Sequence, residues 1–306
     1  MKVVFKALEQ GFCALGMAAC LMAVPVHAQT GVGDVVYVPT PQLAVDEMLL
    51  MAKMNKADYL IDLGSGDGRF VITAAKKYGA KALGVDLDTY LLKVANENAR
   101  KEGVNDRVTF REQNLFETDL TGATVVSTYL LPEMNLKLRS RILKLKPGTR
   151  VVAHDYSMGD WYPDEQKTLV VPEKKVGSQG LSYIFGWVVP ALVAGKWQST
   201  ISVGGKEVPY EFDMEQFFQN IDGGASAGGA RAEIRGKMVG EQVRFSLTGK
   251  DGQKIDRHEF DGKLAGDAIT GTVRIGGGAT SRQANWTAKL VKRGEMLRAQ
   301  DEPDGK

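Results

Sequence analysis

The spacing of apolar residues divides the chain into two parts with different expected secondary structure. Between residues 29 and 192, short β-rich runs alternate with segments whose apolar residues recur every three or four positions. This alternation is typical of a mostly parallel sheet covered by helices, as in Rossmann-like α/β domains. Strands are expected at residues 59–63, 82–85, 108–111, 124–129 and 149–156, and a closing hairpin at residues 168–171 and 183–189.

Helices are expected between these strands. Thr40 and Pro41 predict the start of the first one, with a hydroxyl cap followed by a proline at the first helical position. Gly79 and Gly103 are expected to end the next two helices, and Pro132 to begin a fourth. Residues 29–192 therefore predict one α/β domain.

From about Gly195 the pattern changes to strands alone. Residues 195–294 hold 18 of the 35 glycines, and residues 235–243 resemble residues 261–269, each copy reading as strand, glycine-acidic turn and strand. Residues 193–294 are therefore predicted to form an antiparallel meander or small barrel, opened by Trp197 and closed by Trp286. A turn of helix near residues 215–220, a flexible loop at Gly223–Gly229 and a polar tail at residues 295–306 complete the expected organisation.

Composition adds little to this picture but excludes some classes of protein. The 306 residues are 43% hydrophobic and 25% charged, with a formal net charge of +2, which is ordinary for a globular protein. No concentrated basic segment indicates a nucleic-acid partner, and none is expected.

The N-terminal 28 residues read as a secretory signal peptide. Lys2 and Lys6 precede an apolar run over residues 12–26, and Ala28 offers a small residue before cleavage at Gln29. We therefore expect an exported protein, periplasmic or secreted, without a stable membrane span after cleavage. A retained N-terminal anchor and lipid attachment at Cys20 are the alternatives.

Cleavage would remove both cysteines, Cys13 and Cys20. The mature chain then has no disulfide, no zinc–thiolate site and no cysteine nucleophile. Only three histidines are present, one of them in the signal peptide, so no metal site is expected.

The segment from Asp62 to Phe70, with the sequence DLGSGDGRF, carries the most specific chemistry. It follows a predicted buried strand and precedes a predicted helix, the context that a nucleotide-binding loop requires. Arg69 stands where a dinucleotide loop needs a small residue, and no P-loop lysine follows. A carboxylate at Asp62 repels pyrophosphate but suits a ligand that carries an ammonium and a sulfonium. Asp86, at the end of the next strand, can accept hydrogen bonds from ribose hydroxyls. This chemistry points to S-adenosylmethionine.

These residues resemble motif I and its acidic partner in class I S-adenosylmethionine-dependent methyltransferases. Within that class the chain is similar to the protein-lysine methyltransferases that act on the ATP-synthase c subunit and the adenine nucleotide translocase, and to their bacterial relatives. The resemblance covers roughly residues 35–190 and none of the β-rich part. Its shared features are Tyr37-Val38-Pro39-Thr40-Pro41, Asp62 to Arg69, Tyr129-Leu130-Leu131-Pro132, Lys146 to Val152, and Trp161.

The resemblance implies a set of residues that bind the cofactor. Asn114 falls where this superfamily often contacts the adenine amino group, and Leu115 would lie against the ring, although Asn114 can equally be an ordinary loop residue. The predicted cofactor-binding residues are Asp62, Gly64, Ser65, Gly66, Gly68, Asp86, Asn114 and Leu115.

Three residues are candidates for the substrate channel. Tyr129 and His154 end the fourth and fifth strands, at the edge where open α/β sheets bind ligands, and Glu133 follows Pro132. Each has a structural alternative: a packed aromatic ring for Tyr129, a favourable charge at a helix start for Glu133, and a buried strand-end residue for His154. No catalytic residue is assigned, because methyl transfer needs no obligatory general base.

The resemblance also predicts the reaction. Class I enzymes that methylate amide or base nitrogens usually carry Asn/Asp-Pro-Pro-Tyr after the fourth strand, whereas residues 127–132 here read STYLLP. An N-methyltransferase that acts on a lysine of a protein substrate is therefore expected. The alternative is an exported binding protein that keeps the scaffold without turnover. The β-rich part is expected to recognise the acceptor or to attach the enzyme to an envelope partner.

Overall fold

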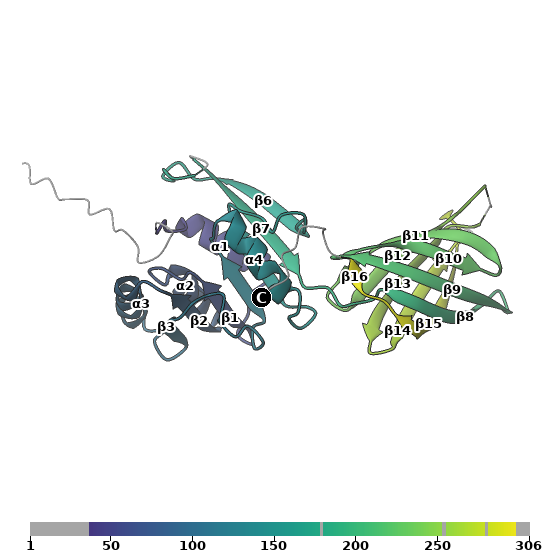
Figure 1. The fold of residues 1–306 in the computed structure, drawn as a ribbon, viewed down its shortest axis with the longest axis horizontal. Helices are drawn as coiled ribbons and strands as arrows, with labels where there is room; N and C mark the ends of the chain where they lie inside the picture. The colour runs from purple at the N-terminus through teal and green to yellow at the C-terminus, as the bar shows by residue number, and fades with distance from the viewer. Residues whose placement is uncertain (1–36, 178–179, 253–254, 279–280, 298–306) are drawn as a thin grey trace, which may run out of the picture.

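The computed structural model describes residues 37–177, 180–252, 255–278 and 281–297. The signal peptide predicted over residues 1–28 and the last part of the predicted tail, residues 298–306, lie outside the described residues. The described chain forms a helix-covered sheet followed by an antiparallel β-barrel (Figure 1). The predicted fold class is confirmed.

The first domain contains a seven-stranded sheet with the strand order β3-β2-β1-β4-β5-β7-β6. The first five strands in this order are parallel, and β7 runs antiparallel to β5. β6 pairs antiparallel with β7 as the expected hairpin. The strands are β1 (Tyr59–Leu63), β2 (Lys81–Asp86), β3 (Val108–Glu112), β4 (Val125–Thr128), β5 (Arg150–His154), β6 (Glu165–Val170) and β7 (Leu181–Val188).

Helices cover both faces of the central strands because those strands are apolar on both sides. The helices are α1 (Gln42–Met51), α2 (Arg69–Tyr78), α3 (Thr89–Lys101) and α4 (Pro132–Ile142). Leu60 and Val125 pack with α1 and α2 on one face, and Ile61 and Val126 pack with α4 on the other. None of the helices in the described ranges is long and apolar enough to cross a membrane.

The start of the first helix differs from the prediction. Helix α1 begins at Gln42, and Pro41 occupies the capping position with φ −56° and ψ 143° and no side-chain cap. Thr40 is therefore not the cap. Its carbonyl oxygen instead accepts a hydrogen bond from Arg69 Nη1 at 2.8 Å, a contact that ties the segment before α1 to the start of α2.

The second domain is a closed barrel in which each strand from β8 to β15 pairs with the next and β15 pairs with β8. Its strands are β8 (Gly195–Val203), β9 (Lys206–Phe217), β10 (Asn220–Ala227), β11 (Ala230–Val239), β12 (Gln242–Gly249), β13 (His258–Ala265), β14 (Ala268–Ile275) and β15 (Arg282–Arg293). Trp197 and Trp286 lie in the two strands that close it, as expected. The predicted polar tail begins with a short strand, β16 (Met296–Leu297), which pairs in parallel with β9.

The glycine-rich stretch Gly223–Gly229 was expected to be a loop, and this prediction is wrong for most of its length. Residues up to Ala227 belong to β10, which pairs with β9 and β11. Gly223 has φ +137°, and a Cβ atom there would lie 2.1 Å from the carbonyl oxygen of Asp213. Glycine at this position therefore allows β9 and β10 to approach each other closely. The helical turn expected near residues 215–220 is likewise absent from this described region, which forms the end of β9 and its turn into β10.

An aromatic side chain from the barrel completes the apolar core of the first domain. Phe218, in the turn between β9 and β10, is 2% exposed and stacks on Trp161 with ring centroids 5.9 Å apart. The Arg139 guanidinium of α4 lies 5.3 Å from the centre of the same ring. Gln219 Nε2 donates to the carbonyl oxygen of Tyr162 at 2.7 Å. The two domains are therefore joined by a packed interface.

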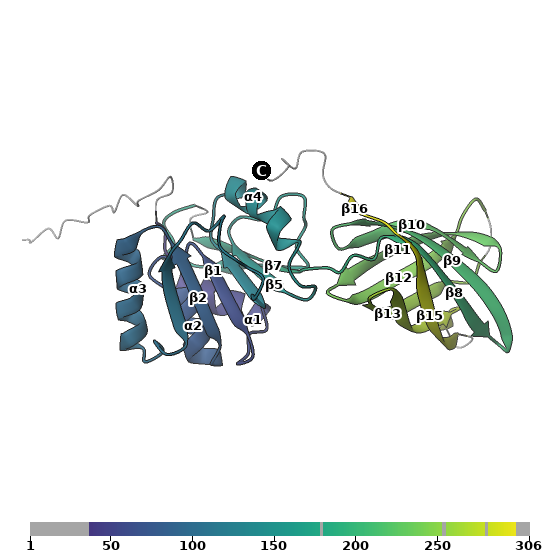
Figure 2. The ribbon, with the colours of Figure 1, turned by 60° about the horizontal axis from the view of Figure 1, so that its bottom comes forward.

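This interface lies away from the carboxyl ends of the parallel strands. Gly240 of the barrel approaches Gly148, just before β5 begins, and Lys237 forms an ion pair with Asp164 at 2.8 Å. In both views the barrel lies beside the β5–β7 side of the sheet, far from α3 (Figure 2). The surroundings of the carboxyl ends of β1 and β2 are thus formed by the first domain alone.

Candidate active site

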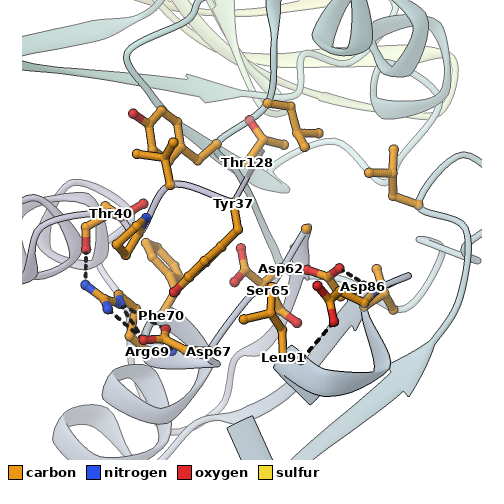
Figure 3. Close-up of a pocket in the computed structure, with 18 of the residues that line it drawn as sticks. Tyr37, Thr40, Asp62, Ser65, Asp67, Arg69, Phe70, Asp86, Leu91 and Thr128 are labelled. Atoms are coloured by element: carbon orange, nitrogen blue, oxygen red, sulfur yellow. Dashed lines mark hydrogen bonds and ion pairs between the residues drawn. The ribbon is translucent and has the colours of Figure 1, made fainter. Parts of the chain in front are cut away.

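A pocket opens at the carboxyl ends of β1, β2 and β4 (Figure 3). The segment before α1 forms one wall, the loop after β1 forms the floor, and the start of α4 completes the lining. The side chains that matter for its chemistry are Tyr37, Thr40, Asp62, Ser65, Asp67, Asp86, Leu115, Thr128, Tyr129 and Met134. Its position at the carboxyl edge is where open α/β sheets bind ligands.

Three glycines shape the loop after β1. Gly64, Gly66 and Gly68 have φ values of +81°, +50° and +79°, which side chains other than glycine rarely adopt. The ring of Tyr37 lies across this loop, so that a Cβ atom at Gly66 would be 2.3 Å from Tyr37 Cε2. The loop backbone can therefore approach a ligand closely, and Tyr37 covers it.

Arg69 links the segment that contains Tyr37 to the loop after β1. Its guanidinium pairs with the Asp67 carboxylate at 2.6 Å and donates to the Thr40 carbonyl oxygen. Burial of Asp67 opposes its ionisation, but the hydrogen bonds from Arg69 outweigh burial and hold the pKa of Asp67 below its usual range. Arg69, the residue that argued against a dinucleotide loop, thus links two segments, and sequence reasoning missed this role because Thr40 lies in another segment.

Asp62 is a buried carboxyl group. It is 7% exposed, and Ser127 Oγ donates to its Oδ1 at 2.6 Å. Burial raises the pKa of Asp62 to about 7, and the negative charges of Asp86 and Asp67 add to the shift. Its ionised form would be stabilised by a cation in the pocket.

The loop and the next strand hold Asp86 in a fixed orientation. Asp86 Oδ2 accepts from the backbone N–H of Gly66 at 2.8 Å, and Oδ1 accepts from that of Asp88 at 3.0 Å. Asp88 in turn caps α3 by accepting from the backbone N–H groups of Tyr90 and Leu91. The remaining lone pairs of Asp86 are available to hydroxyl groups of a ligand.

The pocket fits S-adenosylmethionine chemically. Among the described residues, the buried hydroxyl oxygens of Ser65 and Thr128 line it without a hydrogen-bond partner, as expected where a polar ligand supplies the partner. Asp62 and Asp86 provide acceptors for an ammonium and for ribose hydroxyls. An apolar flank for the adenine ring is formed by Leu87, Leu91 and Leu115.

The structure gathers most of the predicted cofactor residues around this pocket. The backbone N–H of Gly66 donates to Asp86. Gly68 packs against Phe110: a Cβ atom placed on Gly68 would lie 2.6 Å from the Phe110 ring. Asn114 accepts from the backbone N–H of Phe116 at 2.9 Å and does not line the pocket, although Gln113 does. The predicted residues that do line it are Asp62, Gly64, Ser65, Asp86 and Leu115.

Of the three channel candidates, only Tyr129 lines the pocket. Glu133 is exposed at the start of α4 and lies outside the lining. His154 is fully buried behind Tyr129, with ring centroids 4.1 Å apart, and its Nε2 lies 3.0 Å from Ser182 Oγ. Burial lowers the pKa of His154 to about 4, so the imidazole is neutral at pH 7. Within the described ranges, no group of three or more His, Cys, Asp and Glu residues could hold a metal ion.

Sequence reasoning did not assign Tyr37 and Thr128 to the site. Tyr37 stands in the motif shared with the methyltransferases, which was the available signal. Thr128 precedes Tyr129 at the end of β4, so its place at the carboxyl edge could also have identified it.

Substitution of Gly66 by alanine is expected to weaken S-adenosylmethionine binding at least about tenfold, because the new methyl group collides with Tyr37 and displaces the loop. Gly103→Ala is the matched control: Gly103 also has a positive φ, +67°, but a Cβ atom there meets nothing within 4 Å. Both variants should lose about 1 kcal/mol of stability. Isothermal calorimetry should show normal affinity for Gly103→Ala, and equal affinities for the two variants would contradict this account of the loop.

The affinity for S-adenosylmethionine is expected to fall as the pH decreases through 7. Above pH 7 Asp62 is ionised and attracts the cofactor's ammonium; below it, a proton competes. If binding is linked to one proton, the affinity falls by about tenfold per pH unit at pH values well below the pKa of Asp62. Calorimetry between pH 8 and pH 6 measures this, and Asp62→Asn should remove the component due to this carboxyl group. An unchanged pH dependence in Asp62→Asn would rule out the assignment.

Comparison with known proteins connects this pocket to methyltransferases. The ANTKMT methyltransferase domain matches residues 62–165, which contain the glycine loop, Asp86 and Tyr129. The crystal structure of an RNA methyltransferase from Salinibacter ruber with S-adenosyl-L-homocysteine is 45% identical in sequence, with a TM-score of 0.45. The match covers 50% of this chain and 94% of that one.

Two protein relatives extend the comparison. A protein-lysine N-methyltransferase of Saccharolobus islandicus is 44% identical over 136 residues, which are 44% of this chain and 84% of the relative. The human ATP synthase c-subunit lysine N-methyltransferase is 31% identical over 129 residues, 42% of this chain. The match covers 54% of the human protein, so the chain spans about half of its length. The chain belongs to the protein-lysine methyltransferase family and is an S-adenosylmethionine-dependent methyltransferase.

Proposed function

We propose that the protein transfers a methyl group from S-adenosylmethionine to the side-chain amine of a lysine in another protein. The similarity to the archaeal protein-lysine N-methyltransferase, over most of that relative's length, is the observation that carries this proposal. The STYLLP sequence at the end of β4 supports it, because residues 127–132 lack the motif typical of amide and base methylation.

The chain's own residues act by binding and alignment. S-adenosylmethionine supplies a methyl group that its sulfonium makes electrophilic. Asp62 would bind the ammonium of the cofactor, Asp86 would bind its ribose hydroxyls, and Tyr37 would shield the loop from water. The side of the pocket lined by Thr128 and Tyr129, here called the acceptor side, would receive the incoming amine. Alignment of the two reactants is the largest contribution that such a site can make to the rate.

A labelling experiment tests this function. Purified protein is incubated with methyl-labelled S-adenosylmethionine and an envelope fraction, and labelled proteins are digested and analysed by mass spectrometry. We expect the labelled methyl group on lysine, and its amount should be strongly reduced with Gly66→Ala and retained with Gly103→Ala. Binding of S-adenosylmethionine without any modified lysine would contradict turnover and favour a binding protein.

We also propose that the protein acts outside the cytosol. Lys2, Lys6, the apolar run over residues 12–26 and the small residue Ala28 support export. N-terminal sequencing of the protein from its natural source should give Gln29 as the first residue. A protein that begins at Met1 and fractionates with the cytosol would exclude export.

A further inference from the structure

A buried ion pair contacts Tyr129, which lines the pocket. Asp155 follows β5 with φ +60°, a left-handed conformation that is uncommon outside glycine but that aspartate adopts more readily than most residues. Its Oδ2 accepts hydrogen bonds from the Tyr129 hydroxyl, at 3.0 Å, and from Lys174 Nζ. Lys174 also donates to the carbonyl oxygen of Leu181 at 2.6 Å. Residues from three segments thus meet at one carboxylate.

Both charged groups are removed from water. The side chains of Asp155 and Lys174 are 4% and 3% exposed. A buried ion pair is weak evidence for stability, because desolvation of the two charges offsets much of their attraction. Backbone strain at Asp155 points the same way, since such strain is found most often at functional sites. This pair therefore calls for a role beyond holding the fold together.

The pair determines the orientation of the Tyr129 hydroxyl. Because Asp155 is paired with the Lys174 ammonium, this carboxylate accepts hydrogen bonds, and the Tyr129 hydroxyl points its proton toward it. The ring is held by His154 at 4.1 Å and by Tyr156 at 6.4 Å between ring centroids. With its proton used in this way, the phenolic oxygen can only accept a hydrogen bond from a further group.

We propose that Tyr129 contacts the acceptor nitrogen and that Asp155 and Lys174 are the residues that position it. This inference rests on the proposed function and adds the side chains that select the acceptor. An amine has N–H groups that can donate a hydrogen bond to the Tyr129 oxygen. A carboxylate has only acceptor atoms. The site therefore favours an acceptor that donates a hydrogen bond, as an amine does, and disfavours a carboxylate.

The transfer itself balances without a further reactant. The acceptor ammonium first gives one proton to solvent. One N–H is then held by the Tyr129 oxygen, and the nitrogen lone pair forms the new N–C bond to the methyl group. The C–S bond breaks with its electron pair on sulfur, which leaves neutral S-adenosylhomocysteine. Tyr129 keeps its proton throughout, as expected because burial and the Asp155 charge raise the pKa of this phenol above its usual range.

Four variants of the full-length enzyme test this arrangement. Tyr129→Phe removes only the hydroxyl, and Lys174→Met removes the cation at similar length. Each should lower kcat/KM for the protein acceptor by about 10- to 100-fold, the cost of one hydrogen bond to a charged or polarised group. S-adenosylmethionine affinity should stay within about twofold of wild type. Lys174→Arg should restore much of the activity, because it keeps a cation beside Asp155.

Lys175→Met is the matched control. Lys175 is the next residue, but it is exposed, and among the described residues it donates only to the Pro172 carbonyl oxygen, at 3.0 Å. Its loss should leave all parameters unchanged. Full activity of Tyr129→Phe contradicts the inference while the proposed function stands. Equal loss of folding and of cofactor binding in Lys174→Met and Lys174→Arg shows a purely structural pair. No lysine methylation by the wild type contradicts the proposed function and this inference together.

Discussion

The pocket depends on a carboxyl group that the fold buries without a cationic partner among the described side chains. Asp62 lies in β1 between two parallel strands, and in the described part of the chain the Ser127 hydroxyl is the one side-chain donor that replaces its lost contact with water. Two further carboxylates nearby, Asp67 and Asp86, make the site still less tolerant of negative charge. Such an arrangement favours a cationic ligand and disfavours a pyrophosphate, whatever the loop's resemblance to nucleotide-binding motifs. The glycines let a ligand approach this carboxyl group, whereas Tyr37 and Arg69 enclose the loop beside it.

The barrel is coupled to the first domain by more than a linker. Phe218 adopts φ +52° and places its ring among Trp161 and the α4 side chains, so the core of one domain includes a residue of the other. The same α4 carries Met134 at the pocket wall. No described barrel residue lines the pocket, so a role of the barrel in acceptor recognition would be to bind a distant part of the acceptor protein. Attachment to an envelope partner fits the same position equally well.

Sequence alone predicted the features that are local. Periodicity identified the strands, since it reports which faces are buried, and the spacing of glycines and carboxylates identified the cofactor loop. What it missed depends on pairs distant in sequence: Arg69 with Thr40, Asp155 with Lys174, and Phe218 with Trp161. One error arose where a residue type has several uses. Glycine at Gly223 marks strand contact instead of a loop, and no local pattern distinguishes these uses, because the pairing strand β9 decides. Asn114 accepts from the backbone N–H of Phe116 and lies outside the pocket lining.

We expect the buried Asp62 carboxylate and the neighbouring Asp86 to make this pocket select a methionine-derived cation over a dinucleotide. Calorimetric titration of the wild-type protein with S-adenosylmethionine and, separately, with NAD at pH 8 tests it most directly, because both ligands contain an adenosine. The account predicts saturable binding of S-adenosylmethionine, loss of that binding in Asp86→Ala, and no measurable binding of NAD. Binding of NAD with comparable affinity, or equal binding of S-adenosylmethionine by Asp86→Ala, would contradict it.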